Sequence, residues 1–478
     1  MAYKTINPYN NKVVKEYPNA TDEDLEKALS QGQEAYKEMK DQDISERAKI
    51  LHNVAKKFRQ HAAELSKICT VDMGKLLRES EGEVELCAII ADWFADHAAD
   101  LLKPNEIDTI ANGTAEVQHH STGIIWMIEP WNFPYYQVMR VFAPNFMVGN
   151  PTILKHAHNV PGSANAFEKI VNEAGAPKGS FKNLFVSYSQ VSKAIADPRV
   201  QGVALTGSER GGASTAATAG KNLKKNSMEL GGMDPFIVLG DANMDDVANV
   251  AWRARIYNSG QVCTSAKRFI VMDNVYDRFL NDLKDKFSKL KPGDPLDPGT
   301  TLAPINTKEA KETLESQLKD AIDGGAKVAY GNKPIDLPGQ FLEPTILTDI
   351  SKDNPAYKTE LFGPVASVYK VHSEEEAIQI ANDNPYGLGG MLFTGNPDHG
   401  AEVASKIETG MVFINDALAS LPELPFGGVK RSGYGRELDS LGQLAFTNDQ
   451  LIVKAKKPDL NNVAGKLMAT DPQTETSK

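Results

Sequence analysis

The spacing of apolar residues changes several times along this chain of 478 residues. Residues 21–103 carry apolar positions three and four apart, and they begin at Thr21-Asp22-Glu23-Asp24, a capping-type start. We therefore expect this first region to be mostly helical. Residues 106–120 alternate weakly around Asn112-Gly113, which predicts a β-hairpin that projects from the body.

From Gly123 onward, short apolar runs alternate with helical patterns. The runs predict buried parallel strands at 124–128, 152–154, 183–186 and 202–205. The helical patterns lie at 134–148, 161–175 and 189–196, with one more after Gly212. This repetition predicts an open, doubly wound α/β sheet of the Rossmann type.

A second α/β unit begins near Asp234. Its expected strands are 236–239, 269–272, 366–369, 390–393 and 410–414, and its expected helices are 244–258 and 274–290. Residues 451–454 predict a final strand, which we expect to pair with a hairpin of a partner subunit. The polar tail from Asp459 is expected to fray.

Charge and composition narrow the class of protein. The net charge of −11 argues against a nucleic-acid partner, because such proteins need a basic surface. No apolar stretch is long enough to predict a membrane span, and the first residues do not resemble a signal peptide. Three cysteines, Cys69, Cys87 and Cys263, are too few for a disulfide framework. We therefore expect a reduced, cytoplasmic protein.

Three short segments carry candidate chemistry. Cys263 lies in a turn, in the segment Gly260-Gln261-Val262-Cys263-Thr264, and offers a thiol nucleophile. Glu229, followed by Leu230-Gly231-Gly232, offers a general base. Asn132, in Pro130-Trp131-Asn132-Phe133-Pro134, offers an amide that can bind an oxyanion. Together these groups are what the oxidation of an aldehyde through a thioester requires.

A glycine-rich turn provides a candidate phosphate site. Gly207 to Gly212 follows an expected strand and opens an expected helix, whose N-terminus favours an anion. Its spacing differs from G-x-G-x-x-G, so by itself it fits an ordinary strand–helix turn equally well. Lys155 ends another strand at the same end of the sheet, where α/β proteins bind their ligands.

These motifs, in this order, resemble those of the NAD(P)-dependent aldehyde dehydrogenases over nearly the full chain. Two further segments match, Glu360-Leu361-Phe362-Gly363-Pro364 and Pro425-Phe426-Gly427-Gly428. Within that superfamily, residues 154–160 and 229–236 are most similar to a bacterial branch of the succinate-semialdehyde dehydrogenases.

The resemblance implies a division of the chain into domains. A cofactor-binding domain is expected from residues 1–105 and 122–231, and a catalytic domain with Cys263 from 232–432. Residues 106–121 and 446–457 are expected to form a small β element for oligomerisation, in a homodimer or a homotetramer. Residues 459–478 are the expected flexible tail.

The resemblance also implies roles for single residues. Cys263 attacks the aldehyde, Asn132 stabilises the oxyanion beside the Cys263 N–H, and Glu229 activates the water that hydrolyses the thioester to a free acid. No metal is expected, because His156 and His158 lack a third ligand at a recognisable spacing. The residues expected to bind the cofactor are Pro130, Trp131, Lys155, His158, Gly207, Ser208, Gly212, Leu230, Glu360 and Phe362.

The choice of cofactor depends on His158. Many NAD-preferring relatives have a glutamate there, which binds the ribose hydroxyls and repels a 2′-phosphate. This chain has a histidine, which can contact a phosphate when protonated. NAD is the first expectation, from the branch that the chain resembles, and NADP is the alternative.

A semialdehyde acid needs a cation for its distal carboxylate. Arg140 follows Asn132 by about two helical turns, so it shares a face with the oxyanion turn. Arg253 and Ser420 are further candidates. Succinate semialdehyde is therefore the leading substrate, with glutarate semialdehyde or a neutral aliphatic aldehyde as alternatives. An acylating dehydrogenase is disfavoured by Glu229, and a thiol esterase or a structural protein is the alternative from another class.

Overall fold

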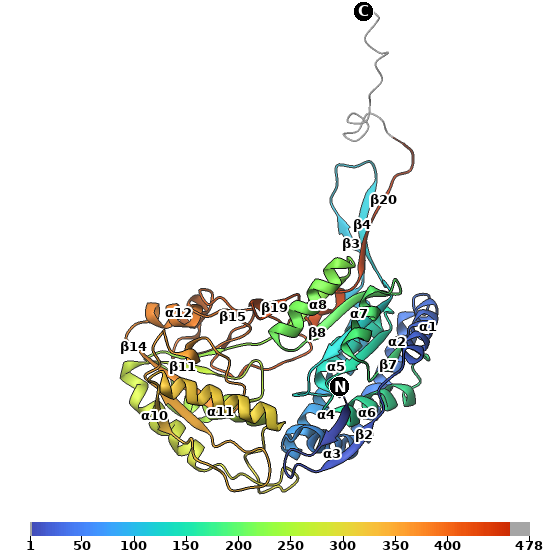
Figure 1. Ribbon diagram of the computed structural model, residues 1–478. Helices are drawn as coiled ribbons and strands as arrows, with labels where there is room; N and C mark the ends of the chain where they lie inside the picture. Colours follow the sequence, from blue (N-terminus) through green and yellow to red (C-terminus); the bar gives the residue numbers. More distant parts are fainter. Residues whose placement is uncertain (1, 459–478) are drawn as a thin grey trace, which may run out of the picture.

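The computed structural model describes residues 2–458 (Figure 1). The tail that was expected to fray, residues 459–478, lies outside the described residues. Figure 1 shows two α/β lobes side by side and a narrow arm that projects from one of them.

The N-terminal region is helical, as its periodicity predicts. It forms α1 (Asp22–Met39), α2 (Ile44–Gln60), α3 (Ala62–Met73) and α4 (Leu77–Leu101), preceded by a two-stranded sheet of β1 (Tyr3–Ile6) and β2 (Val13–Tyr17). The expected cap of α1 is present, because Thr21 Oγ1 accepts from the Asp24 N–H at 3.1 Å. These helices pack into one core together with α5 (Tyr136–Val148).

The first α/β lobe contains a six-stranded sheet in the order β19-β9-β8-β5-β6-β7. All neighbouring strands are parallel except the edge strand β19. The strands are β5 (Ile124–Glu129), β6 (Thr152–His156), β7 (Phe181–Asn183), β8 (Val200–Thr206), β9 (Lys225–Glu229) and β19 (Gly433–Tyr434). Besides α5, the helices are α6 (Pro161–Glu173), α7 (Tyr188–Ala196) and α8 (Glu209–Lys221).

One strand of this sheet is shifted from its expected place. The apolar run 183–186 predicts a strand there, but β7 covers Phe181–Asn183 and the run continues beyond it. Leu184 and Val186 are nevertheless buried. The Phe185 and Val186 carbonyls accept hydrogen bonds from the Ala20 N–H and the Tyr3 hydroxyl. The Leu184 N–H still donates to the Leu154 carbonyl of β6 at 2.9 Å, and beyond Leu184 the apolar run reflects packing against the N-terminal residues.

The second lobe contains a seven-stranded sheet in the order β12-β13-β14-β11-β10-β16-β17. Its strands are β10 (Pro235–Val238), β11 (Arg268–Met272), β12 (Lys327–Tyr330), β13 (Thr345–Thr348), β14 (Val365–Val371), β16 (Met391–Phe393) and β17 (Phe413–Ile414). The helices are α9 (Met244–Ile256), α10 (Asp273–Ser288), α11 (Lys308–Asp323), α12 (Glu374–Asn382) and α13 (Pro397–Ala404). β17 is shorter than the expected run 410–414. Two connected α/β sheets agree with the predicted fold class.

The arm is a three-stranded sheet of β3 (Asn105–Ile107), β4 (Thr114–His120) and β20 (Asn448–Lys454). The predicted hairpin is therefore present. The expected pairing of the last strand with a partner subunit is wrong. β20 pairs antiparallel with β4 of its own chain, from Asn448 opposite His120 to Lys454 opposite Thr114. Periodicity shows that a strand forms, but it does not show which edge the strand will meet.

Within residues 2–458, no helix is both long enough and apolar enough to cross a membrane.

Candidate active site

Two acids lie at the carboxyl ends of the parallel strands on either side of β8. Glu129 ends β5 and Glu229 ends β9, and β8 lies between them with Thr206 at its own end. Thr206 is in register with Glu229. Ligands of open α/β sheets bind at this end of the strands. The sheet therefore delivers the predicted base, Glu229, to the expected edge.

Cys263, the predicted nucleophile, follows a tightly wound turn. Asn258, Ser259 and Gly260 have φ values of 52°, 51° and 77°, so three successive residues have left-handed backbone. The Asn258 N–H donates to Glu79 at 3.1 Å, and the Ser259 hydroxyl donates to the Ala303 carbonyl at 2.7 Å. These contacts offset the cost of the turn. The turn places Cys263 between α9 and β11.

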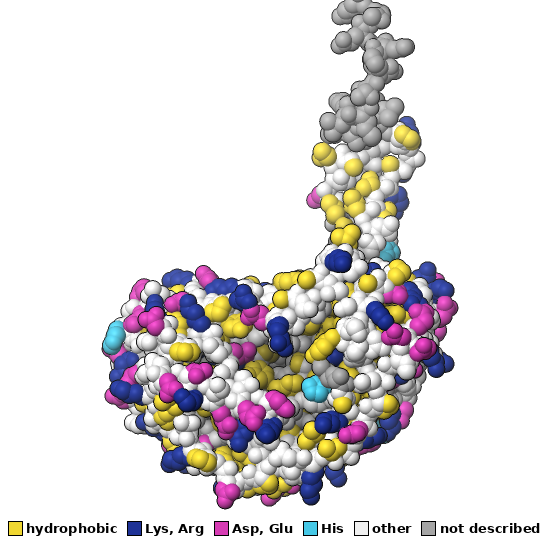
Figure 2. Space-filling view, in the orientation of Figure 1, with side chains coloured by type: hydrophobic (Ala, Val, Ile, Leu, Met, Phe, Trp, Pro, Cys, Tyr) yellow, Lys and Arg dark blue, Asp and Glu magenta, His cyan; other side chains and the backbone are white. Residues whose placement is uncertain are grey.

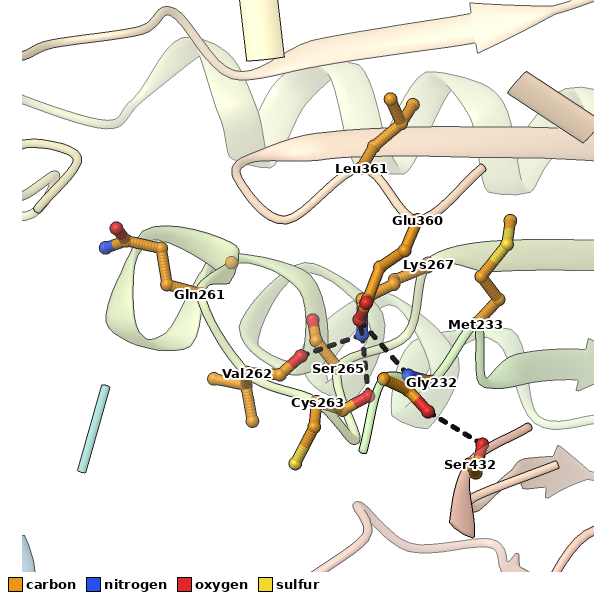
Figure 3. Close-up of polar contacts among 12 residues, drawn as sticks. Gly232, Met233, Gln261, Val262, Cys263, Ser265, Lys267, Glu360, Leu361 and Ser432 are labelled. Carbon is orange, nitrogen blue, oxygen red and sulfur yellow. Dashed lines mark hydrogen bonds and ion pairs between the residues drawn. The ribbon is translucent and has the colours of Figure 1, made fainter. Parts of the chain in front are cut away.

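Side chains hold the carbonyls of the nucleophile loop. Asn132 Nδ2 donates to the Gln261 carbonyl at 3.0 Å, so the predicted oxyanion donor contacts the loop of the predicted nucleophile. Lys267 Nζ donates to the Val262 carbonyl at 2.8 Å and to the Cys263 carbonyl at 2.6 Å (Figure 3). Asn132 is thus linked to Cys263 indirectly, through its hydrogen bond to the backbone two residues earlier.

A cavity of about 540 Å³ opens onto Cys263, a volume typical of small-molecule sites. Trp131 and Phe362 face each other across it edge to face, with ring centroids 5.9 Å apart. Nine of the predicted site residues line it: Pro130, Trp131, Asn132, Gly207, Ser208, Leu230, Cys263, Glu360 and Phe362. Residues that the sequence did not single out also line it, namely Gln137, Thr206, Glu209, Arg210, Gly231, Gln317, Lys358, Thr359 and Tyr386.

The glycine-rich turn forms one wall of this cavity. Ser208 caps α8, where its hydroxyl accepts from the Gly211 N–H at 3.2 Å. A Cβ at Gly212 would come within 2.5 Å of Leu230, so only glycine lets α8 pack this close to the strand end. A Cβ at Gly231 would come within 2.6 Å of the Glu360 carboxylate. The close backbone and the open helix N-terminus fit a dinucleotide phosphate.

Lys155 and His158 lie next to this region but do not line the cavity. Lys155 is the residue before the last in β6, and its ammonium lies 5.4 Å from the centroid of the Tyr188 ring. Burial lowers the pKa of Lys155 to about 8. Partial desolvation and the charge of Lys155 both lower the pKa of His158, whose side chain still reaches solvent.

Burial favours the uncharged forms of both Cys263 and Glu229. Burial raises the pKa of Cys263 to about 11, while the charges of Lys267 and Arg140 oppose that rise. Burial and the nearby Glu437 carboxylate raise the pKa of Glu229 well above its ordinary value, and Arg140 opposes this. A carboxyl with a raised pKa is the kind of group that exchanges protons near neutral pH.

The candidate substrate residues fall in two places. Arg140 is buried on α5, where it pairs with Glu437 and donates to Tyr136 Oη at 3.2 Å and to Thr206 Oγ1 at 3.1 Å. Ser420 lies near the same Tyr136 hydroxyl and lowers its pKa, and none of Arg140, Tyr136 and Ser420 lines the cavity. The structure thus brings Arg140 and Ser420 together. Arg253 does not join them: it is exposed on α9, with its guanidinium over the Trp252 ring.

Across the described part of the chain, no group of three or more histidine, cysteine, aspartate or glutamate side chains is arranged to hold a metal ion. The free thiols of Cys69 and Cys87 are buried, and burial raises the pKa of each. A reactive thiol needs access and positive potential. Of the three cysteines, only Cys263 reaches the cavity.

Sequence reasoning missed two residues of this site. Lys267 is four residues beyond Cys263, but its contact with Glu360 joins distant segments and leaves no pattern in the sequence. Glu437, the partner of Arg140, follows the segment Gly427–Arg436 without any periodic context.

Comparisons with known proteins agree with this geometry. Residues 1–452 match the aldehyde dehydrogenase family. The chain is 45% identical over 450 residues to a succinate-semialdehyde dehydrogenase [NADP(+)] of Deinococcus radiodurans, with 94% of each chain covered. It is 54% identical to a Streptococcus pyogenes succinic semialdehyde dehydrogenase whose crystal structure holds NADP+ (TM-score 0.94, 95% of this chain and 100% of that one).

A more distant structure shares the same fold. The betaine aldehyde dehydrogenase of Staphylococcus aureus, in complex with NAD+, is 30% identical, with a TM-score of 0.92 over 97% of this chain and 93% of that one. The shared architecture therefore extends beyond one substrate and one cofactor. A thiol and an amide that line one cavity, together with these matches, place the chain in the aldehyde dehydrogenase family.

Proposed function

We propose that the protein oxidises succinate semialdehyde to succinate with NADP. The observation that carries this proposal is the cluster of Arg140, Tyr136 and Ser420. The charge of Arg140 acts on both the Cys263 thiol and the Glu229 carboxyl, so this cluster lies close to the two proposed reacting groups. A guanidinium with two hydroxyls matches the distal carboxylate of a short semialdehyde. The names of the relatives support the same substrate.

The first chemical step uses Cys263 and Asn132. The Cys263 thiolate attacks the aldehyde carbon, and the carbonyl oxygen becomes an oxyanion. Asn132 carries two N–H donors, of which one is bonded to the Gln261 carbonyl. The second is free to stabilise the oxyanion together with the Cys263 backbone N–H.

The second step uses Glu229. A thioester on Cys263 must be hydrolysed, and no oxygen of the Glu229 carboxyl has a hydrogen-bond partner within the described residues. An ionised Glu229 can therefore take a proton from water. The water oxygen attacks the thioester carbon, the Cys263 thiolate leaves, and the product is a free acid.

The cofactor would bind at the cavity wall described above. When bound, the nicotinamide accepts the hydride that leaves the aldehyde carbon. Gly207, Ser208, Gly212 and Leu230 would hold the phosphates, and Trp131, Glu360 and Phe362 the nicotinamide end.

We propose NADP and not NAD as the preferred cofactor, which reverses the first expectation from sequence. Position 158 carries no acid to repel a 2′-phosphate. Lys155 and Lys4 act on His158 as positive charges, against Glu309 alone as a negative one. Replacement His158→Glu should therefore raise the KM for NADP and leave that for NAD unchanged or lower. A higher KM for NADP than for NAD in the wild type would contradict the proposal.

Steady-state kinetics with succinate semialdehyde and butanal test the substrate. Ser420→Ala and Arg140→Lys should raise the KM for succinate semialdehyde and spare butanal, because only the first carries a carboxylate. Arg140→Ala is less suitable, since an unpaired buried Glu437 costs about 3–5 kcal/mol of stability. Arg253→Ala is the matched control, an exposed arginine outside the cavity. If the variants changed the KM values for succinate semialdehyde and butanal equally, the proposal that a semialdehyde is the substrate would fail.

We propose further that the arm mediates a homodimer or homotetramer. Ile107, Ile110, Leu451 and Val453 are exposed on it by 44%, 81%, 59% and 47% (Figure 2). Exposed apolar side chains gathered on one thin element are typical of a surface that another chain covers. Sedimentation of a variant with Ile110 and Leu451 replaced by serine should show smaller particles than the wild type. An unchanged sedimentation coefficient would contradict this role.

A further inference from the structure

We propose that Lys267 is a positioning residue that orients the peptide groups on both sides of Cys263 and holds Glu360 against the cofactor cavity. This inference rests on the proposed function, since it assigns Cys263 as the nucleophile. None of the motifs that identify the family includes a role for this lysine.

The Lys267 ammonium is fully enclosed and fully bonded. The residue is 2% exposed and lies immediately before β11. Its Nζ contacts three acceptors: the carbonyls of Val262 and Cys263, at 2.8 Å and 2.6 Å, and the Glu360 carboxylate at 3.1 Å (Figure 3). An ammonium has three N–H donors, so every donor has an acceptor.

These bonds orient the loop that carries the nucleophile. In a trans peptide the C=O and the N–H point in opposite directions. Because Lys267 holds the Val262 carbonyl, it directs the Cys263 N–H of the same peptide to the opposite side. Asn132 and Asn258 hold the preceding carbonyl, that of Gln261, at 3.0 Å and 3.3 Å. Three consecutive carbonyls are thus bound by side chains, and the N–H expected to meet the oxyanion is aligned by Lys267.

The same charge acts on the thiol. Four charged or titratable groups affect Cys263: Lys267 and Arg140 favour its thiolate, whereas Asp234 and Glu229 oppose it. Of the two favourable charges, that of Lys267 has the larger effect on the pKa of Cys263. A lysine next to a cysteine lowers the thiol pKa and increases the fraction that can attack.

Lys267 also connects the nucleophile loop to the cofactor wall. Glu360 Oε1 accepts from the Gly232 N–H at 3.2 Å in addition to its pair with Lys267. Gly232 in turn lies against the Cys263 carbonyl, which a Cβ there would approach to 2.7 Å. Loss of the ammonium would release both Glu360 and the loop, so one residue couples the position of the thiol to that of the cofactor.

Alkylation of the cofactor-free enzyme with iodoacetamide tests the proposal. The rate would be followed from pH 6 to pH 10, on the rising limb below the Cys263 midpoint, so that a displacement of this limb along the pH axis reports a change in the midpoint. The modified residue would be assigned by peptide mass spectrometry. Lys267→Met should move the midpoint for Cys263 to higher pH and slow alkylation at pH 7.5 by about tenfold, the effect of about one pKa unit. Lys267→Gln retains a donor for a carbonyl but not the charge, so it should show the same displaced midpoint.

Steady-state kinetics separate positioning from thiol activation. Lys267→Gln should retain more of the wild-type kcat than Lys267→Met, because it still bonds the loop. Both should raise the KM for NADP, because Glu360 is released. Lys289→Met, at the exposed end of α10, is the matched control and should match the wild type in every measurement.

Each outcome has one meaning. If a folded Lys267→Met protein, judged by its melting curve, shows the wild-type alkylation profile and KM for NADP, Lys267 is a structural residue and the proposal fails. If the wild-type protein reduces no NADP with any aldehyde, the proposed function fails, yet a displaced alkylation midpoint would still support the effect of Lys267 on the thiol.

Discussion

Two buried cations lie close enough to Cys263 to act on it, and their surroundings differ. Lys267 pairs directly with one carboxylate, Glu360, and its other N–H groups donate to two backbone carbonyls. Arg140 pairs with Glu437, and the carboxyls of Glu129 and Glu229 also raise its pKa against the effect of burial. The lysine pocket is therefore close to charge balance, whereas the arginine pocket has three acids for two arginines, Arg140 and Arg436.

The difference separates two tasks. A balanced ammonium on backbone carbonyls fixes geometry and favours the thiolate. A surplus of buried acids cannot be fully ionised, because each charge opposes the next, so protons are retained there. A carboxyl with a raised pKa binds a proton more strongly, so the ionised fraction of Glu229 takes a proton from water more readily. The thiol and the base are thus prepared by opposite electrostatic means.

Removal of the nucleophile should give the largest effect. Cys263→Ala should lower aldehyde oxidation at least about a thousandfold, as expected when a covalent mechanism loses its attacking group. It should also show no burst of reduced cofactor in a stopped-flow experiment. Cys69→Ala is the control, a buried thiol far from the cavity lining. Comparable loss in both variants would mean that Cys263 is not the nucleophile.

Removal of the base should give a smaller loss and a different kinetic trace. Glu229→Gln should lower turnover by about 10²–10⁴-fold, the range for a general base. Because Cys263 remains, one equivalent of reduced cofactor should form rapidly and an acyl group should stay on the protein, detected as a mass increase. An unacylated protein after mixing would assign Glu229 to the first step and not to hydrolysis.

A methyl group added at Gly232 should disturb the surroundings of Lys267 and leave those of Arg140 unchanged. Gly232→Ala places a Cβ 2.7 Å from the Cys263 carbonyl, which Lys267 holds. A displacement of about 1 Å at a reacting group costs about 100-fold in rate, so we expect a loss of up to that size in kcat. Gly220→Ala, where a Cβ has open space, is the matched control. Equal kcat values for the two variants would show that the loop tolerates the shift.

The smallest effect should be a change in pH dependence. Glu437 raises the pKa of Glu229, so Glu437→Gln should lower it. The base works when ionised, so the acidic limb of the kcat profile should move to lower pH, with the melting curve as a test of folding. An acidic limb that stays in place would show that Glu437 does not act on the base.

The structure brings the motif residues to one edge because they lie at or after the ends of parallel strands. Glu229 directly ends β9, and the Asn132 turn follows β5. Parallel strands bring their carboxyl ends to one edge, so local pattern was enough to place them together. The strand at 183–186 was misplaced because Leu184 and Val186 are buried by segments near the N-terminus, and burial alone does not identify a ladder.

The sequence by itself determined the repeated α/β pattern, the hairpin around Asn112-Gly113 and the three reactive side chains, because each depends on residues close in the chain. Only the tertiary structure decided that β20 pairs with β4, that Arg140 meets Glu437 and that Lys267 meets Glu360. These contacts join segments far apart in sequence. Their partners are chosen by the packing of whole sheets, which no local spacing encodes.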